Sequence, residues 1–204
     1  MSLVLKSLIN RIMSIIQKIQ SEFVAKGPDL SSREAGTWLR KKIKDLGIKQ
    51  RTLLTDHDRL RKIAYIGKMY FFFYDPKTKE KLPYYDTFPL VIPLERYNDG
   101  FLGLNLHYVA PKIRMQILDV LHKTASNTKM DDTTRMKVNY NIITSIAKSR
   151  FMKPCIKRYL TSHIASRFVL ISADEWYLAA MLPFEAFKKL PKTKVFNKSR
   201  EQYQ

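Results

Sequence analysis

Four carboxylate side chains in one central segment could support metal-dependent chemistry: Asp75, Asp86, Glu95 and Asp99. Carboxylates hold Mg²⁺, and bound Mg²⁺ assists phosphodiester hydrolysis, so a metal-dependent nuclease is one hypothesis. The usual Asp…Glu-x-Lys arrangement is not present, because Arg96-Tyr97 follows Glu95. Asp75 and Asp99 also lie where turns favour aspartate. The nuclease is therefore a minor alternative, and we expect no metal site.

Other residue types that carry catalysis are few. The four histidines show no metal-ligand spacing; they are His57, His107, His122 and His163. The single cysteine, Cys155, cannot form an internal disulfide, and a lone cysteine is more often structural than reactive. The sequence has neither a Walker-type phosphate loop nor a glycine-rich dinucleotide motif. We therefore expect a protein that is not an enzyme and needs no cofactor.

The charge of the chain is its most unusual property. Lysine and arginine total 37 against 18 acidic residues, a net charge of +19. Residues 1–62 carry 14 basic and 6 acidic side chains, residues 110–165 carry 11 and 3, and residues 166–204 carry 7 and 4, but residues 63–109 carry 5 of each. A charge that only kept the protein in solution would be spread more evenly. The partition favours a polyanionic partner, DNA above all.

Candidate DNA-binding side chains fall in three basic stretches. The first is Arg40, Lys41, Lys42, Lys44, Lys49 and Arg51; the second is Lys148, Arg150, Lys153, Lys157 and Arg158; the third is Lys188, Lys189, Lys192 and Lys194. No zinc-finger spacing, basic zipper or aromatic RNA-recognition motif accompanies them. We therefore expect contacts to phosphates, which bind DNA without reading its sequence.

The elements that position these side chains begin with helices in residues 1–62. Apolar residues at helical spacing predict a helix over 3–23, and a capping-box pattern at 31–34 begins a second helix whose buried stripe runs over 35–46. A short third helix is expected over 56–63. No run of 18 apolar residues exists, so we expect no transmembrane helix and no membrane partner.

Residues 63–109 predict a compact antiparallel sheet or a small barrel. The aromatic run 69–74 is typical of a strand, the prolines of segment 82–94 restrict it to an edge or bent strand, and Asn98-Asp99-Gly100 is typical of a tight hairpin before a strand over 101–108. The aromatic run could stack single-stranded bases, but burial on both faces is the better interpretation.

The rest of the chain predicts a helical insertion at about 110–165, with helices over 113–121, 136–146 and 154–164. Strands are then expected over 168–172 and 176–182. The predicted class is α+β: N-terminal helices over 1–62, and a domain over 63–187 built on a small antiparallel sheet or barrel with the helical insertion.

Residues 188–204 are expected to be a basic C-terminal tail that is ordered only against a partner. Truncation after Pro191 should then leave the melting temperature unchanged. Alternatively, the tail could anchor in a neighbouring subunit through Val195, Phe196 and Tyr203.

Several motifs resemble a family of tailed-bacteriophage proteins from T-even-like myoviruses. They are residues 71–79, 82–86, 88–91, 99–108, 153–160 and 176–184. The resemblance covers about residues 69–184 and carries over no catalytic residue. It implies a virion protein of the DNA end protector type, present in the host cytoplasm during assembly, with DNA and other virion subunits as partners. A structural tail, neck or baseplate protein is the alternative.

Overall fold

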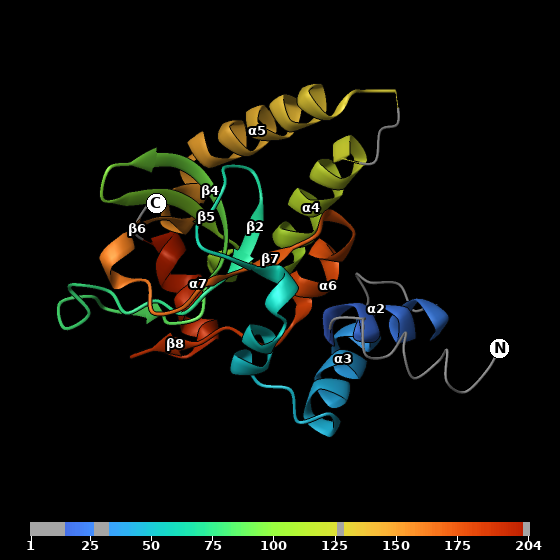
Figure 1. Cartoon of the computed structure of the whole chain (residues 1–204). Coiled ribbons are helices and arrows are strands. Elements are labelled where there is room, and N and C mark those ends of the chain that lie inside the picture. The colour runs from blue at the N-terminus through green and yellow to red at the C-terminus, as the bar shows by residue number, and fades with distance from the viewer. Residues whose placement is uncertain (1–14, 27–32, 126–128, 202–204) are drawn as a thin grey trace.

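An antiparallel sheet of six strands lies at the centre of the computed structural model, which describes residues 15–26, 33–125 and 129–201 (Figure 1). The strands lie in the order β1 (Leu60–Arg61), β7 (Phe168–Ile171), β2 (Met69–Phe71), β4 (Leu90–Tyr97), β5 (Gly100–Asn105) and β6 (Ile156–Leu160). A second sheet pairs β3 (Tyr85–Asp86) with β8 (Phe187–Lys188). Helices accompany these sheets, so the predicted α+β class is confirmed.

The hairpin between β4 and β5 forms where the Asn98-Asp99-Gly100 motif predicts it, with Tyr97 paired to Gly100. Pro93 lies inside β4, and the register shifts between Pro93 and Glu95. Strand β2 pairs with β4 only at Leu90 and Val91, so the proline lies beyond that pairing. The missing N–H of Pro93 therefore interrupts no ladder with β2, as expected for a bent strand.

The sheet is strongly curled and encloses a small aromatic core. The ring of Phe72 lies 5.2 Å from Tyr159 on β6 and 5.0 Å from Phe168 on β7, although these strands are far apart in the sheet order. The close approach of β5 to β6 requires a residue without a side chain, because a Cβ at Gly100 would lie 1.9 Å from the carbonyl oxygen of Tyr159. Tyr70, Phe72 and Tyr74 are buried in this core, so the base-stacking interpretation of the aromatic run is wrong.

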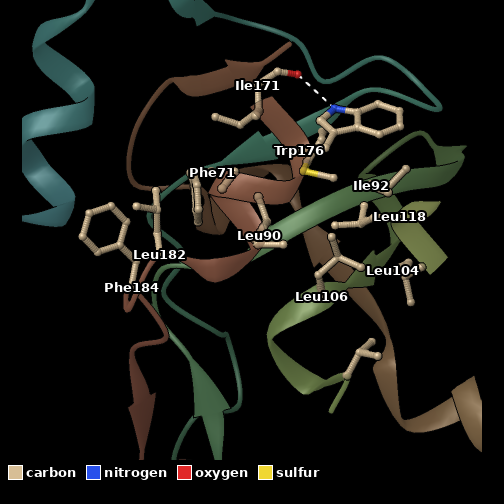
Figure 2. Packing of buried hydrophobic residues seen from close by; sticks show 14 of the residues in the cluster. Phe71, Leu90, Ile92, Leu104, Leu106, Leu118, Ile171, Trp176, Leu182 and Phe184 are labelled. Carbon is tan, nitrogen blue, oxygen red and sulfur yellow. Dashed lines mark hydrogen bonds between the residues drawn. The ribbon is translucent and has the colours of Figure 1, made fainter. Parts of the chain in front are cut away.

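The opposite face of the sheet carries the main hydrophobic core (Figure 2). There Phe71, Leu90 and Leu104 pack with Trp176 and Leu182 from the C-terminal part of the chain. The indole N–H of Trp176 donates a hydrogen bond of 3.3 Å to the carbonyl oxygen of Ile171, which satisfies its one polar group in the core. Strand β2 is therefore buried on both faces, which explains its unbroken aromatic run.

Six described helices pack around the sheets (Figure 1). They are α2 (Ile15–Lys26), α3 (Arg33–Asp45), α4 (Pro111–Ala125), α5 (Asp132–Lys148), α6 (Trp176–Met181) and α7 (Lys192–Glu201). None of these helices has the length and apolar character needed to cross a membrane. Helices α4 and α5 confirm two predicted helices of the insertion and contact each other.

The N-terminal helices fit their predicted pattern in part. Ile16, Ile19 and Phe23 of α2 are buried, and Phe23 lies edge-on to Trp38 of α3 with centroids 5.3 Å apart. Gly47 has a φ of 61°, the left-handed conformation expected just after a helix. Leu46 is half exposed, so its assignment to the buried stripe is wrong. The predicted helix start at Leu3 and the capping residue Ser31 lie outside the described residues.

The predicted helix over 154–164 is wrong. A 3₁₀ turn, η4 (Arg150–Cys155), precedes strand β6, which pairs with β5 from Gly100 opposite Leu160 to Leu104 opposite Ile156. The unpaired edge of β5 supplies a hydrogen-bond ladder that the local sequence pattern does not reveal, and tertiary pairing overrides the weak helical periodicity. The helical part of the insertion therefore ends before β6.

Two further element predictions are wrong. Residues 176–181 form helix α6 in place of a strand, because Ser172 and Glu175 form a capping box just before a run of good helix formers. Residues 56–63 form only the 3₁₀ turn η2 (His57–Arg59) before β1. Both guanidinium Nη atoms of Arg59 donate to the fully buried carboxylate of Glu175 at 2.5 and 2.7 Å, which ties this N-terminal segment to the C-terminal half.

The basic tail is ordered in the folded chain, contrary to the prediction. Strand β8 pairs Lys188 with Tyr85, and α7 contacts η4 and the 3₁₀ turn η3 (Leu106–Tyr108). Val195 is fully buried, and its side chain belongs to the main core. Val195 is therefore not free to anchor in another subunit, and Tyr203 lies outside the described residues. The division of the chain at residues 62 and 187 remains a prediction.

Replacing Val195 by Ala should lower the free energy of unfolding by about 2 kcal/mol, because two methyl groups leave the core and a cavity remains. Chemical denaturation of the two proteins measures this difference. The matched control is Lys194→Ala, which changes an exposed neighbour and should alter stability by less than about 0.5 kcal/mol. Equal stability of Val195→Ala and the wild type would mean that α7 does not dock as described.

Candidate nucleic-acid interface

The first basic stretch lies on α3 and on the 3₁₀ turn η1 (Gln50–Thr55) that follows it. Arg40, Lys41, Lys44, Lys49 and Arg51 are exposed. Lys42 is half-buried and forms a salt bridge with Glu22 of α2, so its charge is already compensated. The guanidinium of Arg51 lies 6.0 Å from the ring centroid of Phe73.

The second stretch begins at the end of α5 and continues through η4 into β6. Lys148, Arg150 and Lys153 are exposed. Lys157 is half-buried, with its ammonium 4.4 Å from the ring centroid of Tyr108. Arg158 is exposed, bonds the carboxylate of Asp99 at 2.5 Å and lies over the ring of Tyr97.

The third stretch lies on β8 and α7 and is used partly for internal contacts. Lys189 donates to the carbonyl oxygens of Glu80 and Leu82 at 2.7 and 2.9 Å, and Lys192 donates to Glu185 at 2.9 Å. Lys188 and Lys194 are exposed.

The structure brings the second and third stretches together, since α7 packs on η4. No carboxylate among the described residues bonds to the following exposed lysines: Lys148, Lys153, Lys188 and Lys194. The exposed cations of the first stretch lie on α3, which packs beside α2, and on the segment from Lys49 into η1 (Figure 1). Several predicted site residues already have partners within the chain: Lys42, Arg158 and Lys192 bond carboxylates, Lys189 bonds backbone carbonyls, Arg40 donates to the hydroxyl of Thr37, and Arg150 also interacts within the chain.

A pocket of about 430 Å³ opens beside the second and third stretches. Its walls come from residues 74–78, residues 82–86, the end of β5 with η3, and strand β6. Tyrosines from each of these segments line it, together with Lys77, Lys157 and Arg158. This volume is within the range of small-ligand sites, roughly 300–1,000 Å³.

The base of the pocket is held by a buried hydrogen-bond network centred on Asp86. The Asp86 carboxylate accepts from the backbone N–H of Phe88 at 3.0 Å and of Ala186 at 3.2 Å. Its other oxygen lies 2.7 Å from Nδ1 of His107 and 3.4 Å from Nδ2 of Asn105. Asn105 also donates to the hydroxyl of Tyr159 at 3.0 Å. These bonds join β3, the end of β5, β6 and the segment before β8.

A second buried ionic group lies next to this network. The guanidinium of Arg114 donates to the carbonyl oxygens of Ala180 at 2.5 Å and Val109 at 3.2 Å, and lies 3.4 Å from the carboxylate of Glu185. Burial of Glu185 opposes its ionisation, but the charges of His107, Arg114 and Lys192 outweigh burial and lower its pKa. Burial lowers the pKa of Arg114. The ion pair fixes α4 against the segment that leads into β8.

The four carboxylates of the nuclease hypothesis lie in four different settings. Asp75 binds Lys79, Asp99 binds Arg158, Asp86 is buried in the network, and Glu95 is exposed. Within residues 15–26, 33–125 and 129–201, no group of three or more His, Cys, Asp or Glu side chains is arranged to hold a metal ion. Asp86 does have a role, but it is the structural one described above.

The sequence analysis predicts neither the pocket nor the hydrogen-bond network of Asp86 at its base. Their residues are scattered over four segments, and the part of β6 that carries Lys157 and Tyr159 was predicted as helix. Asn105, His107 and Arg114 give no local signal, because each is recognisable only by its buried partners. The one local signal is the concentration of tyrosines, since six of the eleven lie between residues 70 and 108.

The fold and surface define a basic α+β protein with exposed cations suited to nucleic-acid phosphates. Residues 6–202 match the protein family described as phage T4 terminal DNA protecting protein. Because the match spans nearly the whole chain, the protein belongs to this family of phage DNA-protecting proteins, as the resemblance in the central segment implied. No curated protein and no solved structure matches the chain.

Replacing Glu185 by Gln should destabilise the protein at pH 7 by about 3 kcal/mol, because Arg114 stays buried without a carboxylate partner. The pKa of Glu185 is lowered in the fold, so its contribution is complete above the ordinary value of 4.5 and is lost as the pH falls through the lower folded value. The deficit of the variant should therefore shrink below pH 4.5.

Urea denaturation of the wild type and the Glu185→Gln variant between pH 7 and pH 3 measures how the stability deficit changes with pH. Glu80→Gln is the control, because Glu80 is exposed, and it should change stability by less than about 0.5 kcal/mol throughout. A Glu185→Gln deficit that stays constant with pH would contradict the ion-pair explanation.

Proposed function

We propose that this protein binds the ends of phage DNA in the virion, independently of sequence, and protects them without itself being an enzyme. The family match over residues 6–202 is the observation that carries this proposal. Other virion subunits are its neighbours in the particle, and the host cytoplasm is where it first meets DNA during assembly.

Exposed lysines and arginines supply the affinity. Each cation that replaces a condensed counterion on a phosphate releases that ion to solution, which favours binding at low salt. Lys148, Lys153 and Lys194 suit this role, because they are exposed and none is bonded to a carboxylate among the described residues. The cations on α3 and η1 offer a second area for phosphate contacts.

The protein protects a DNA end by covering the strand terminus. An exonuclease must reach a strand terminus, so a folded protein that covers the terminus blocks access without chemistry of its own. The buried networks described above keep the binding surface rigid, which limits the entropy lost when DNA binds.

Affinity for linear duplex should fall steeply with salt, with a log–log slope of about −0.9 for each phosphate contacted. The triple variant Lys148→Gln, Lys153→Gln, Lys194→Gln should have a slope shallower by up to about three units. The control removes the same charge elsewhere, at exposed Lys68, Lys123 and Lys137.

Fluorescence anisotropy over a salt series measures the DNA affinity, and hence the log–log slope, of the wild type and both triple variants. A control variant that loses as much slope as the test variant would show that only net charge matters. Absence of DNA binding in low salt would overturn the proposal and favour a structural tail, neck or baseplate role.

The purified protein should not cut DNA in the presence of Mg²⁺ or Mn²⁺, and it should slow the digestion of linear duplex by an added exonuclease. Gel analysis of end-labelled DNA reads both results. Cleavage that disappears in the Glu95→Gln variant would support the nuclease instead; Glu95 is suitable because its carboxylate is exposed and its replacement should not disturb the core.

A further inference from the structure

The pocket beside β6 combines one available aromatic ring with one uncompensated cation. Tyr84, Tyr108 and Tyr159 are buried and contact other aromatic rings, so they form its walls. Tyr85 is half-buried, and no other ring among the described residues contacts it. The ring of Tyr85 is therefore suited to stack against a flat ligand.

Lys157 gives the pocket its charge. The Lys157 ammonium lies over the ring of Tyr108 at 4.4 Å, and no carboxylate of the described chain bonds to it. Burial lowers the pKa of Lys157, which shows that the fold does not compensate its charge fully. An anionic group in the pocket would supply that compensation.

The rim and base of the pocket restrict what can enter. Lys77 is exposed and bonds to no carboxylate of the described chain, so its side of the pocket favours anions, whereas the charge of Arg158 is compensated by Asp99. At the base, Asp86, Asn105 and Tyr159 are buried and bonded to one another. These bonded groups close the pocket at its base, and one nucleotide at the end of a strand can enter from the open side.

We propose that this pocket holds the unpaired terminal nucleotide of a DNA strand. The base stacks on Tyr85, and Lys157 contacts the adjacent phosphate. Stacking of a base on an aromatic side chain beside a cation is the usual chemistry of single-strand recognition and tolerates any base. This inference rests on the proposed function, since it names how a DNA end is distinguished from the interior of a duplex.

The test uses a hairpin duplex with one open end that carries a single unpaired 2-aminopurine nucleotide at its 5′ or 3′ terminus. Fluorescence of 2-aminopurine falls when the base stacks on an aromatic ring. The wild type should quench the terminal probe, with one terminus quenched more than the other. It should leave unchanged the fluorescence of a probe placed inside the duplex.

Tyr85→Leu and Lys157→Met should each abolish the quenching and weaken binding to the open-ended duplex by about tenfold. Both variants should bind a duplex closed by hairpins at both ends within about twofold of the wild type. The matched controls are Tyr65→Leu and Lys68→Met, which change exposed residues outside the pocket and should retain the quenching. Melting temperatures establish that the variants are folded, and Lys157→Met tests the proposal even if Tyr85→Leu fails to fold.

Two results would overturn the inference while leaving DNA binding intact. One is equal affinity of the wild type for open and closed duplexes with no quenching. The other is displacement of the terminal probe by micromolar deoxynucleoside monophosphate, which would assign the pocket to a free nucleotide. Failure to bind either duplex would overturn the proposed function as well.

Discussion

The structure depends on the burial of one carboxylate, that of Asp86. A buried carboxylate is tolerated only when its oxygens are fully hydrogen-bonded, and Asp86 meets this requirement with four partners from three parts of the chain. Its bonds require that the segment before β8 return to β3, and that His107 and Asn105 face inward at the end of β5. The short sheet of β3 and β8 and the base of the pocket are both consequences of this requirement.

The packing of the chain also determines where the charge lies. The sheet segment, residues 63–109, is electrically neutral because it holds five basic and five acidic residues, whereas the surplus cations lie on elements around it: α3, the end of α5, η4, β8 and α7. The docking of α7 through Val195 brings two basic stretches that are 30 or more residues apart in sequence to one side of the pocket. Core packing therefore sets the arrangement of the cations.

The sequence predicts features that depend on local chemistry: the α+β class, the hairpin at Asn98-Asp99-Gly100, helices α4 and α5, and burial of Tyr70 and Phe71 on opposite faces of β2. The sequence-based prediction fails where contact with a segment distant in sequence determines the local structure. Residues 156–160 become a strand because β5 has a free edge, and α7 is ordered because Val195 finds a place in the core. The candidate cations could be named from charge alone, but which of them are free could not, because Lys42 and Arg158 find acidic partners from other elements.

Charge alone cannot explain how a protein recognises the end of DNA. Every phosphate along a duplex presents nearly the same field, so lysines and arginines on a surface bind the interior as well as the terminus. A terminus differs from the interior in two respects. Its last nucleotide can leave the base stack at a low cost in free energy, and the strand does not continue beyond that nucleotide. The proposed site, a pocket closed at its base with an aromatic ring and a lysine, would respond to both differences, because it has room for one unstacked nucleotide. The cations then supply affinity for DNA in general, and the pocket converts this affinity into a preference for the end.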